Sequence, residues 1–345
     1  MQDEIHINSY SQLINSVGSL LSAARQNAYR EVNNILLTTY WNIGKDIVEF
    51  EQHGNERAEY GKNLLNQLSK DLKVEHSKGF SRSNLQNMRL FYLNYPNYQT
   101  VSGNLTWSHY VELLSISDEL ARSFYEKQCM LENWGIRELK RQKNTALFER
   151  LALSMDKKEV LDLSKQGKLI QNTQDIIKDP YVFEFLDLPT SNYKEKQLEN
   201  ALIDKLEHFL LELGKGFAFI AQQHKITLNN THFYVDLVFY HRILKCFVLI
   251  DLKTRKVSHQ DIGQMNMYLN YFKMEENVED DNPPIGIVLA ADKDEIMVEY
   301  ATGSITNQLF VSRYQLHLPD IKLLKEELEL LINDENKKGI TNENK

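Results

Sequence analysis

Two neighbouring apolar runs decide the fold of this chain: HFYVDLVFYH, residues 232–241, and LKCFVLIDLK, residues 244–253. The first run alternates, with Asp236 among its even positions and a continuous apolar row at its odd positions, which is the period of a β-strand. The second run is almost wholly apolar until it reaches Asp251, as expected for a buried strand. The short connection between the runs predicts a β-hairpin.

The hairpin brings Asp236 and Asp251 toward one edge of the predicted sheet. Lys253 follows Asp251 by two residues and projects from the same face, with Cα atoms roughly 7 Å apart at ~3.3 Å per residue. Two close carboxylates repel unless a positive charge lies between them, and Mg²⁺ prefers oxygen ligands. The plainer interpretation is a solvated strand residue and an ordinary strand end, because motif matches are frequently accidental.

The elements around this hairpin predict a mixed α/β domain. A helix over residues 194–213 precedes it, and the helix over 259–272 that follows carries Gln264 and Tyr268 one turn apart. The expected order α-β-β-β-α-β uses strands over residues 217–227, 232–241, 244–253 and 285–290.

The first half of the chain predicts helices, because apolar residues recur there at spacings of three and four. The expected helices cover residues 10–26, 29–52, 60–72, 83–95, 107–114, 118–132 and 136–153. We expect an all-helical N-terminal domain over 1–155, a linker with some short helix over 156–192 and the mixed domain over 193–320. Residues 321–345 predict a C-terminal helix and a frayed polar tail after Leu331.

Composition narrows the class of protein. Two cysteines in 345 residues exclude a disulfide framework and a zinc site made chiefly of thiolates, which predicts a reducing, cytoplasmic compartment. No run approaches the ~20 apolar residues of a membrane span, so no membrane is expected as a partner. The net charge of −8 is carried by the second part of the chain, since residues 1–150 hold 17 basic and 17 acidic side chains.

Two basic clusters lie in the first half of the chain. Residues 76–110 contain no carboxylate but do contain Lys78, Arg82 and Arg89, and Ser81 is placed to cap the helix that follows. The second cluster consists of Arg137, Lys140 and Arg141. Such side chains contact DNA phosphates in helical DNA-binding domains. Solvated helix faces, a dimer contact or a protein contact explain them equally well from the residues alone.

Several stretches resemble a known family. VDLVFY, FVLIDLK and GQMNMYL resemble the PD-(D/E)XK nuclease superfamily, with the QxxxY element of its RecB-like members. The similarity is closer to bacterial proteins of the YhcG type, which join a helical domain to such a nuclease domain. LLELGKGFAFIAQQHKI and NPPIGIVLA resemble the nuclease part, and YWNIGKDI, YGKNLLNQLSKDL, GFSRSNLQNMRLFY and WGIRELKRQ resemble the helical part.

The resemblance implies roles for particular residues. Asp236 and Asp251 match the metal ligands, and Lys253 matches the residue that orients or activates the attacking water. Glu199 matches the first acidic residue of the family, while Gln264 and Tyr268 match QxxxY. An exposed helical glutamate is the alternative interpretation of Glu199.

Two positions depart from the family pattern. Val235 stands where the name-giving proline would be, and Asp251 stands where these relatives usually have glutamate. The shorter side chain would shift a bound metal by about one methylene.

The leading hypothesis is a cytoplasmic endonuclease that uses Mg²⁺, or Mn²⁺, to hydrolyse DNA in defence against foreign DNA or in repair, as the resemblance implies. Partners would be DNA, a second copy of the chain, and components of a restriction or repair system. The rival is a non-catalytic DNA-binding or scaffold protein that keeps the fold. Cleavage of RNA is a third alternative, since the chemistry does not distinguish the sugars.

Overall fold

The computed structural model describes residues 10–52, 58–76, 78–98, 101–153, 157–168, 170–189, 193–303, 305, 308–318, 320–326 and 328. The predicted tail after Leu331 lies outside these residues. Over the described part of the chain, no helix is both long and apolar enough to cross a membrane. The chain forms two compact units. Unit 1 is Met1–Arg122 with Trp134–Leu139, and unit 2 is Ser123–Asn133 with Lys140–Lys345.

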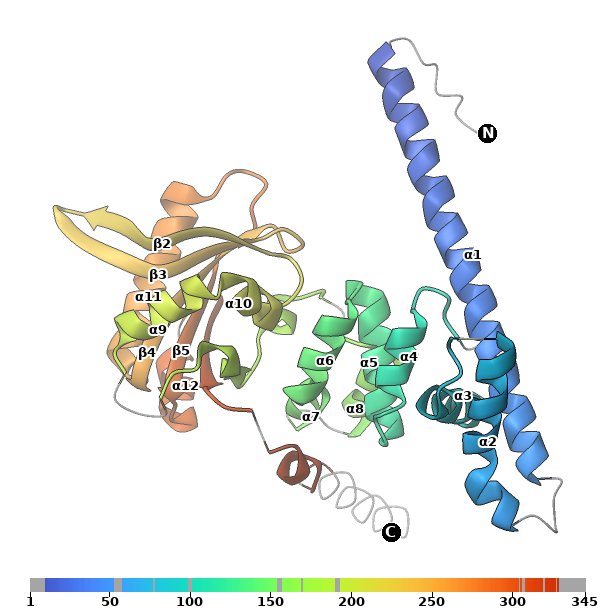
Figure 1. Cartoon of the computed structure of the whole chain (residues 1–345). Helices are drawn as coiled ribbons and strands as arrows, with labels where there is room; N and C mark the ends of the chain where they lie inside the picture. The colour runs from blue at the N-terminus through green and yellow to red at the C-terminus, as the bar shows by residue number, and fades with distance from the viewer. Residues whose placement is uncertain are drawn as a thin grey trace, which may run out of the picture. The chain divides into compact units, whose positions relative to one another are not determined.

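Unit 1 is built around α1 (Tyr10–Gln52), one helix of 43 residues where the sequence predicted two. The second half of α1 packs against α2 (Ala58–His76) and α3 (Arg82–Asn94), whereas its first half extends past them (Figure 1). At Gly44 an added Cβ would lie 2.0 Å from a backbone oxygen of α3, so only glycine permits this close approach. The helix α4 (Trp107–Leu113) completes this group.

The next helices are α5 (Glu119–Glu132), α6 (Ile136–Asn144), α7 (Leu147–Ala152) and α8 (Lys157–Gln166). The single helix predicted over 136–153 is two helices, because the backbone turns at Ala146, where φ is 52°. Most of α5, the end of α6, and all of α7 and α8 belong to unit 2. The segment expected as a linker, 156–192, holds α8 and the strand β1 (Tyr181–Val182), which pairs with β6 (Gln308–Gln315).

Unit 2 contains the mixed α/β domain that the sequence predicted. Its remaining elements are α9 (Glu195–Asp204), α10 (Leu206–Leu213), β2 (Phe217–Leu228), β3 (Thr231–His241), β4 (Cys246–Lys256), α11 (His259–Tyr271), β5 (Ile285–Asp292), α12 (Glu295–Thr302) and β6 (Gln308–Gln315). The predicted helix over 194–213 is divided at Lys205, where the backbone leaves the helical region. The αβββαβ order is confirmed, and β6 and β1 extend the predicted sheet.

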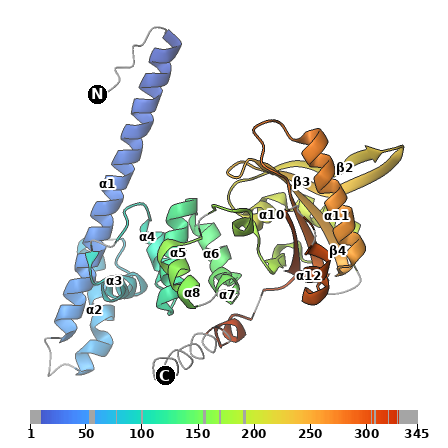
Figure 2. The same ribbon diagram turned by 180° about the vertical axis from the view of Figure 1, so that it is seen from behind.

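The sheet has the strand order β1-β6-β5-β4-β3-β2. Strands β2, β3 and β4 are antiparallel neighbours, and β4, β5, β6 and β1 run parallel. One face packs on α9 and α10 through residues such as Leu237 and Ile250. The other packs on α11 and α12 through residues such as Val238 and Leu249 (Figures 1 and 2). The strand β4 is therefore buried on both faces at the centre of the domain.

The apolar row predicted along β3 is not continuous. Leu237 and Phe239 pack on the α9 side, whereas Phe233 and Val235 pack in the core on the α11 side. The β2–β3 pair is irregular near this point, because its register shifts between Phe219 and Ala221 and Gln223 of β2 has a φ of 51°. The turn at Asn229-Asn230 has φ values of 45° and 63°, as a tight two-residue hairpin requires.

Candidate active site

The candidate site lies where the pairing of β3 with β4 ends. The last ladder pair is Leu237 with Ile250, so the next step places Asp236 opposite Asp251. Residues that face each other across an antiparallel pair project to the same side, with Cβ atoms ~5 Å apart. The Asp236 side chain continues the ladder, because its Oδ2 accepts a hydrogen bond of 2.8 Å from the backbone N–H of Leu252. The predicted convergence of the two carboxylates is present.

Asp251 is a buried acid with incomplete compensation. Asp251 is 2% exposed, and burial raises the pKa of its carboxyl to about 7. The positive charge of Lys253 opposes this rise, and the negative charge of Asp236 adds to it. Lys253 Nζ lies 2.6 Å from Asp251 Oδ2, which makes an ion pair. Among the described residues, however, Oδ2 has no partner in hydrogen-bonding geometry. The site therefore holds a buried carboxylate oxygen that is still able to accept a ligand.

Lys253 is the cation of the site and is 8% exposed. Burial is the largest single effect and lowers its pKa, but the charge and hydrogen bond of Asp251 together with the charges of Asp236 and Glu195 raise the net pKa above the ordinary value. Lys253 also lies 4.0 Å from Glu195 Oε2 and donates a hydrogen bond to the carbonyl of Leu252. A protonated amine held beside two carboxylates can stabilise negative charge that develops on a substrate.

Gln264 and Tyr268 connect α11 to the same part of β3. Gln264 Nε2 donates to the hydroxyl of Tyr268, and this hydroxyl donates to the carbonyl of Tyr234 at 3.0 Å, two residues before Asp236. Tyr268 is fully buried, and burial raises its pKa, although the hydrogen bond from Gln264 lowers it. The pair therefore supports the backbone that carries Asp236.

Glu199 of α9 is buried, at 5% exposure, so the alternative of an exposed helical glutamate is wrong. Its Oε1 accepts a hydrogen bond of 2.7 Å from Gln222, and its Oε2 accepts one of 2.8 Å from Gln223. Gln223 Nε2 also donates to Asp236 Oδ1 at 3.0 Å. One amide group thus joins Glu199 to Asp236.

Gln223 is a site residue that the sequence reasoning missed. It stands opposite Asp236, and its φ of 51° is uncommon for a residue other than glycine. The sequence could have indicated this position, because counting back from the predicted turn at Asn229-Asn230 places residue 223 opposite residue 236. Backbone strain of this kind is concentrated at functional sites, where it costs about 1–3 kcal/mol.

The chemistry of this donor set fits a hard divalent cation. Asp236 and Asp251 offer carboxylate oxygens, and the buried Oδ2 of Asp251 faces one cation, Lys253, at 2.6 Å. Over the described residues, no three or more His, Cys, Asp or Glu side chains come together as a metal-ligand set. Two protein carboxylates suffice for Mg²⁺, which usually keeps waters and takes the rest of its ligands from substrate phosphates.

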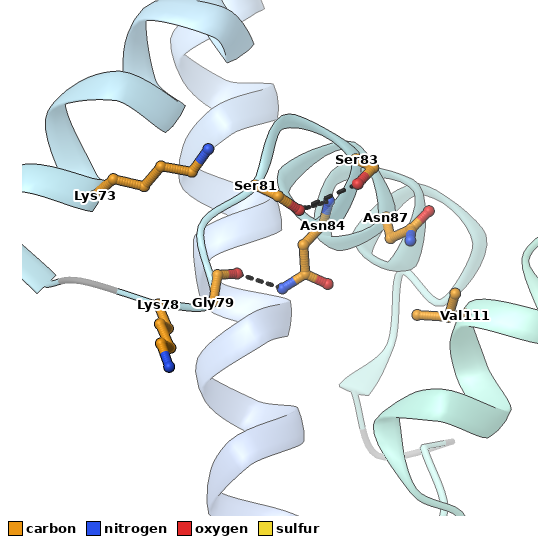
Figure 3. Close-up of a pocket in the computed structure, with 8 residues that line it drawn as sticks. All are labelled: Lys73, Lys78, Gly79, Ser81, Ser83, Asn84, Asn87 and Val111. Atoms are coloured by element: carbon orange, nitrogen blue, oxygen red, sulfur yellow. Dashed lines mark hydrogen bonds between the residues drawn. The ribbon is translucent and has the colours of Figure 1, made fainter.

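The first predicted DNA-binding cluster lies beside a pocket in unit 1. The pocket has a volume of about 590 Å³ and opens at the start of α3, as Figure 3 shows. Its lining consists of Lys73, Lys78, Gly79, Ser81, Ser83, Asn84, Asn87 and Val111. Ser81 caps α3 as predicted, since its Oγ accepts from the N–H of Asn84 at 3.1 Å. Arg82 is exposed at the first position of α3.

The other predicted DNA contacts lie in different surroundings. Arg89 is held by Glu51, with Nε 2.7 Å from Oε2. Arg137 and Lys140 are exposed on α6. Arg141 does not belong to an exposed basic cluster, because its side chain is 10% exposed and faces carboxylates in the interior of unit 2.

Arg141 belongs to a buried ion-pair cluster around Glu212, which is fully buried. Arg141 lies 3.0 Å from Glu212 Oε2, and Arg150 lies 3.2 Å from Oε1. The N–H of Val182 also donates to Oε1, and Lys178 donates to the backbone carbonyl of Glu212. Burial alone would raise the pKa of Glu212, but the nearby cations lower it to about 2.

The fold and the acidic pair with its lysine define the PD-(D/E)XK nuclease class. Residues 174–329 match the family described as "YhcG PDDEXK nuclease domain", and residues 16–150 match "DUF1016 N-terminal domain". The chain is 41% identical over 351 residues to "Putative nuclease YhcG" of Escherichia coli (strain K12), which covers 92% of this chain and 93% of that protein. The chain therefore belongs to the YhcG family of nuclease-fold proteins.

Solved structures also show similarity to part of the chain. A repair endonuclease from Pyrococcus abyssi is 19% identical with a TM-score of 0.27, over 38% of this chain and 50% of that chain. EndoMS, in a structure called "EndoMS-dsDNA2 complex", is 16% identical with a TM-score of 0.26, over 39% of this chain and 49% of that chain. These matches span about half the length of each of those proteins.

Proposed function

We propose that this chain is a cytoplasmic, Mg²⁺-dependent DNA endonuclease whose site comprises Asp236, Asp251 and Lys253. The observation that carries the proposal is the convergence of Asp236 and Asp251 beside Lys253, whose Nζ lies 2.6 Å from the buried Oδ2 of Asp251. A stabilising role alone gives no reason for this arrangement, because an incompletely compensated buried carboxylate is costly. Membership of a family with a nuclease domain supports the same conclusion.

In this proposal the residues divide the work. Asp236 and Asp251 hold the divalent cation, which when bound polarises the scissile phosphate and lowers the pKa of an attacking water. Mn²⁺ would serve in place of Mg²⁺, since both accept carboxylate oxygens. Lys253 orients the water and stabilises negative charge on the phosphoryl oxygens. Gln264 and Tyr268 position β3, while Glu199 and Gln223 hold Asp236.

DNA contacts made by helices of the first 150 residues are the second part of the proposal. Lys78 and Arg82 flank the pocket at the start of α3, which also offers hydroxyl and amide side chains suited to phosphate oxygens. Arg137 and Lys140 remain proposed contacts, and Arg89 would have to leave Glu51 to join them. If these side chains contact phosphates, replacing each one reduces the salt dependence of DNA binding by about one ion.

The proposal is tested by incubating the purified full chain with supercoiled, linear, single-stranded and junction DNA. We expect cleavage with Mg²⁺ and none with a chelator. Lys253→Ala should reduce the rate by about 10²-fold or more. The matched control is Lys256→Ala, which removes an exposed lysine of the same strand that pairs with Asp294 at 3.2 Å. Equal cleavage by wild type and Lys253→Ala would overturn the assignment.

The same experiment separates the rival functions. Tight, salt-sensitive DNA binding without cleavage in Mg²⁺ or Mn²⁺ would identify a non-catalytic DNA-binding or scaffold protein. Preferential cleavage of an RNA of matched sequence would identify a ribonuclease. A role in defence or repair is tested in the host, where deletion of the gene should increase sensitivity to phage or to DNA damage.

A further inference from the structure

The N-terminal half of α1 carries an apolar stripe that no other element of the described part of unit 1 covers, and the stripe continues to Val32 and Ile35, on either side of the position where Asn33 bonds the carbonyls of Gly103 and Leu105. At ~100° per residue, six large apolar side chains fall within ~40° of one line along the helix. The α1 stripe consists of Tyr10, Ile14, Val17, Leu21, Val32 and Ile35, which are 45% to 77% exposed. Ala24 and Ala28 lie on the same line.

Unit 1 uses the opposite face of α1 for its own core. The buried residues Leu37, Gly44 and Val48 lie about 160–200° around the helix from the α1 stripe, and the fourth buried residue, Ile47, lies about 100° from it. The stripe is therefore not a continuation of the surface that packs on α2 and α3. The extension of α1 past these helices is visible in both views of the chain (Figures 1 and 2).

A solvated helix of this composition is not expected to be stable alone. Helices without tertiary packing are marginal in water, and this one includes Gly18 and several serine and asparagine residues. Residues 10–24 also contain no charged side chain, whereas an exposed helix face is normally rich in charge. The missing stabilisation must come from a surface that covers the stripe.

We propose that this surface is the α1 stripe of a second copy of the chain. Positions 10, 14, 17, 21, 24 and 28 step by four and three, which is the seam spacing with which identical helices pair. Because residues 10–24 carry no charge, two copies meet there without repulsion between identical charges. The stripe is ~38 Å long at ~1.5 Å per residue, which gives a second helix a continuous seam to pair along.

The experiment measures the mass of the purified full chain by sedimentation equilibrium, and it does not depend on nuclease activity. We expect a dimer or higher oligomer for wild type and a monomer for Val17→Glu/Leu21→Glu. The matched control is Ser19→Glu/Ala23→Glu, which adds two charges at the same spacing on the opposite, exposed face of α1. The control should keep the mass of wild type.

A variant with alanine in place of the charged residues tests association without the risk that new charges unfold the helix. Val17→Ala/Leu21→Ala keeps a strong helix former at both positions, so the helix should persist while association weakens by at least ~10-fold. A monomeric wild type would overturn the proposal, whether the stripe is then covered by lipid, by another protein or by another part of the same chain. An oligomer that survives Val17→Glu/Leu21→Glu unchanged would overturn it as well.

Discussion

Glu212 and Asp251 are two buried carboxylates of unit 2 that lie beside basic residues, and their pKa values move in opposite directions. Glu212 receives two arginines, a lysine and a backbone N–H, and its pKa falls to about 2. Asp251 receives one lysine and faces a second carboxylate, and its pKa rises to about 7. Burial penalises the charge of both acids, so the difference lies in the number of compensating groups.

The contrast distinguishes a structural acid from a functional one. Both carboxylate oxygens of Glu212 have donors within 3.2 Å, which leaves nothing for a ligand. The buried Oδ2 of Asp251 is compensated by one cation, Lys253, and Asp236 adds a second negative charge beside it. Perturbed acids that are poorly compensated are concentrated at active sites. Within the same unit, Glu212 thus contributes to stability, and Asp251 remains available to bind a ligand.

The largest expected effect is on the structural acid. Glu212→Gln keeps the volume but leaves Arg141, Arg150 and Lys178 without their counterion, so we expect the free energy of unfolding to fall by about 3–5 kcal/mol. Urea denaturation followed by circular dichroism measures this change. The control is Glu207→Gln, which alters an exposed glutamate of the same helix. A loss below ~1 kcal/mol would contradict a structural role for the cluster.

The second prediction concerns acid stability. Because the folded pKa of Glu212, about 2, lies below its ordinary value of 4.5, its stabilisation is present above 4.5 and disappears as the pH falls toward 2. The shift corresponds to about 3 kcal/mol. As the pH falls through this window, the free energy of unfolding of wild type should therefore decrease more steeply than that of Glu212→Gln. Parallel curves for the two proteins would show that the Glu212 carboxylate is not specially stabilised.

Ionisation of Asp251, the functional acid, should lower stability, whereas ionisation of Glu212 raises it. The folded pKa of Asp251, about 7, lies above its ordinary value of 3.8, so its ionisation costs stability that accumulates between these values. Asp251→Asn should raise the free energy of unfolding above pH 7 by on the order of 1–3 kcal/mol, with no gain near pH 4. Thermal denaturation without metal checks this, with the exposed Asp204→Asn as control. Destabilisation at pH 8 would contradict the comparison.

The smallest expected effect is at Gln223. Gln223→Ala removes the amide that joins Glu199 to Asp236, and we expect DNA cleavage to slow by about 10-fold with a weaker apparent affinity for Mg²⁺. Gln222→Ala should have a smaller effect, since Gln222 contacts Glu199 and not Asp236. Metal titration of the cleavage rate separates the two variants. Equal titration midpoints for wild type and Gln223→Ala would remove Gln223 from the site.

The sequence predicted the central elements of the nuclease-type domain because their periodicity is strong. The β3–β4 hairpin and the meeting of Asp236 with Asp251 followed from alternation and a short turn. The breaks at Ala146 and Lys205 were not predictable, because no glycine or proline marks them. Strand β6 was missed, since it pairs in parallel with a strand separated from it by a helix.

The surroundings of individual charges were harder to predict than the strands. Arg141 looked like part of a solvated basic cluster, yet its partner Glu212 lies 71 residues further along the chain. Glu199 looked exposed because its neighbours formed the apolar side of the helix, and the two glutamines that bury it come from β2. Long-range pairing of this kind leaves no local signal in a single sequence.

The strand β4 carries core and chemistry on alternate positions. Ile250 and Leu252 pack in the core on the α9 side of the sheet, and Asp251 and Lys253 alternate with them along the strand. A slip of one residue during folding would exchange the two sets and drive both charges into an apolar layer. The charged side chains of the site therefore favour the correct register of β4, because burying them in the apolar core would destabilise the misregistered fold. The same alternation of charged and apolar residues along β4 thus places the site residues and sets the strand register.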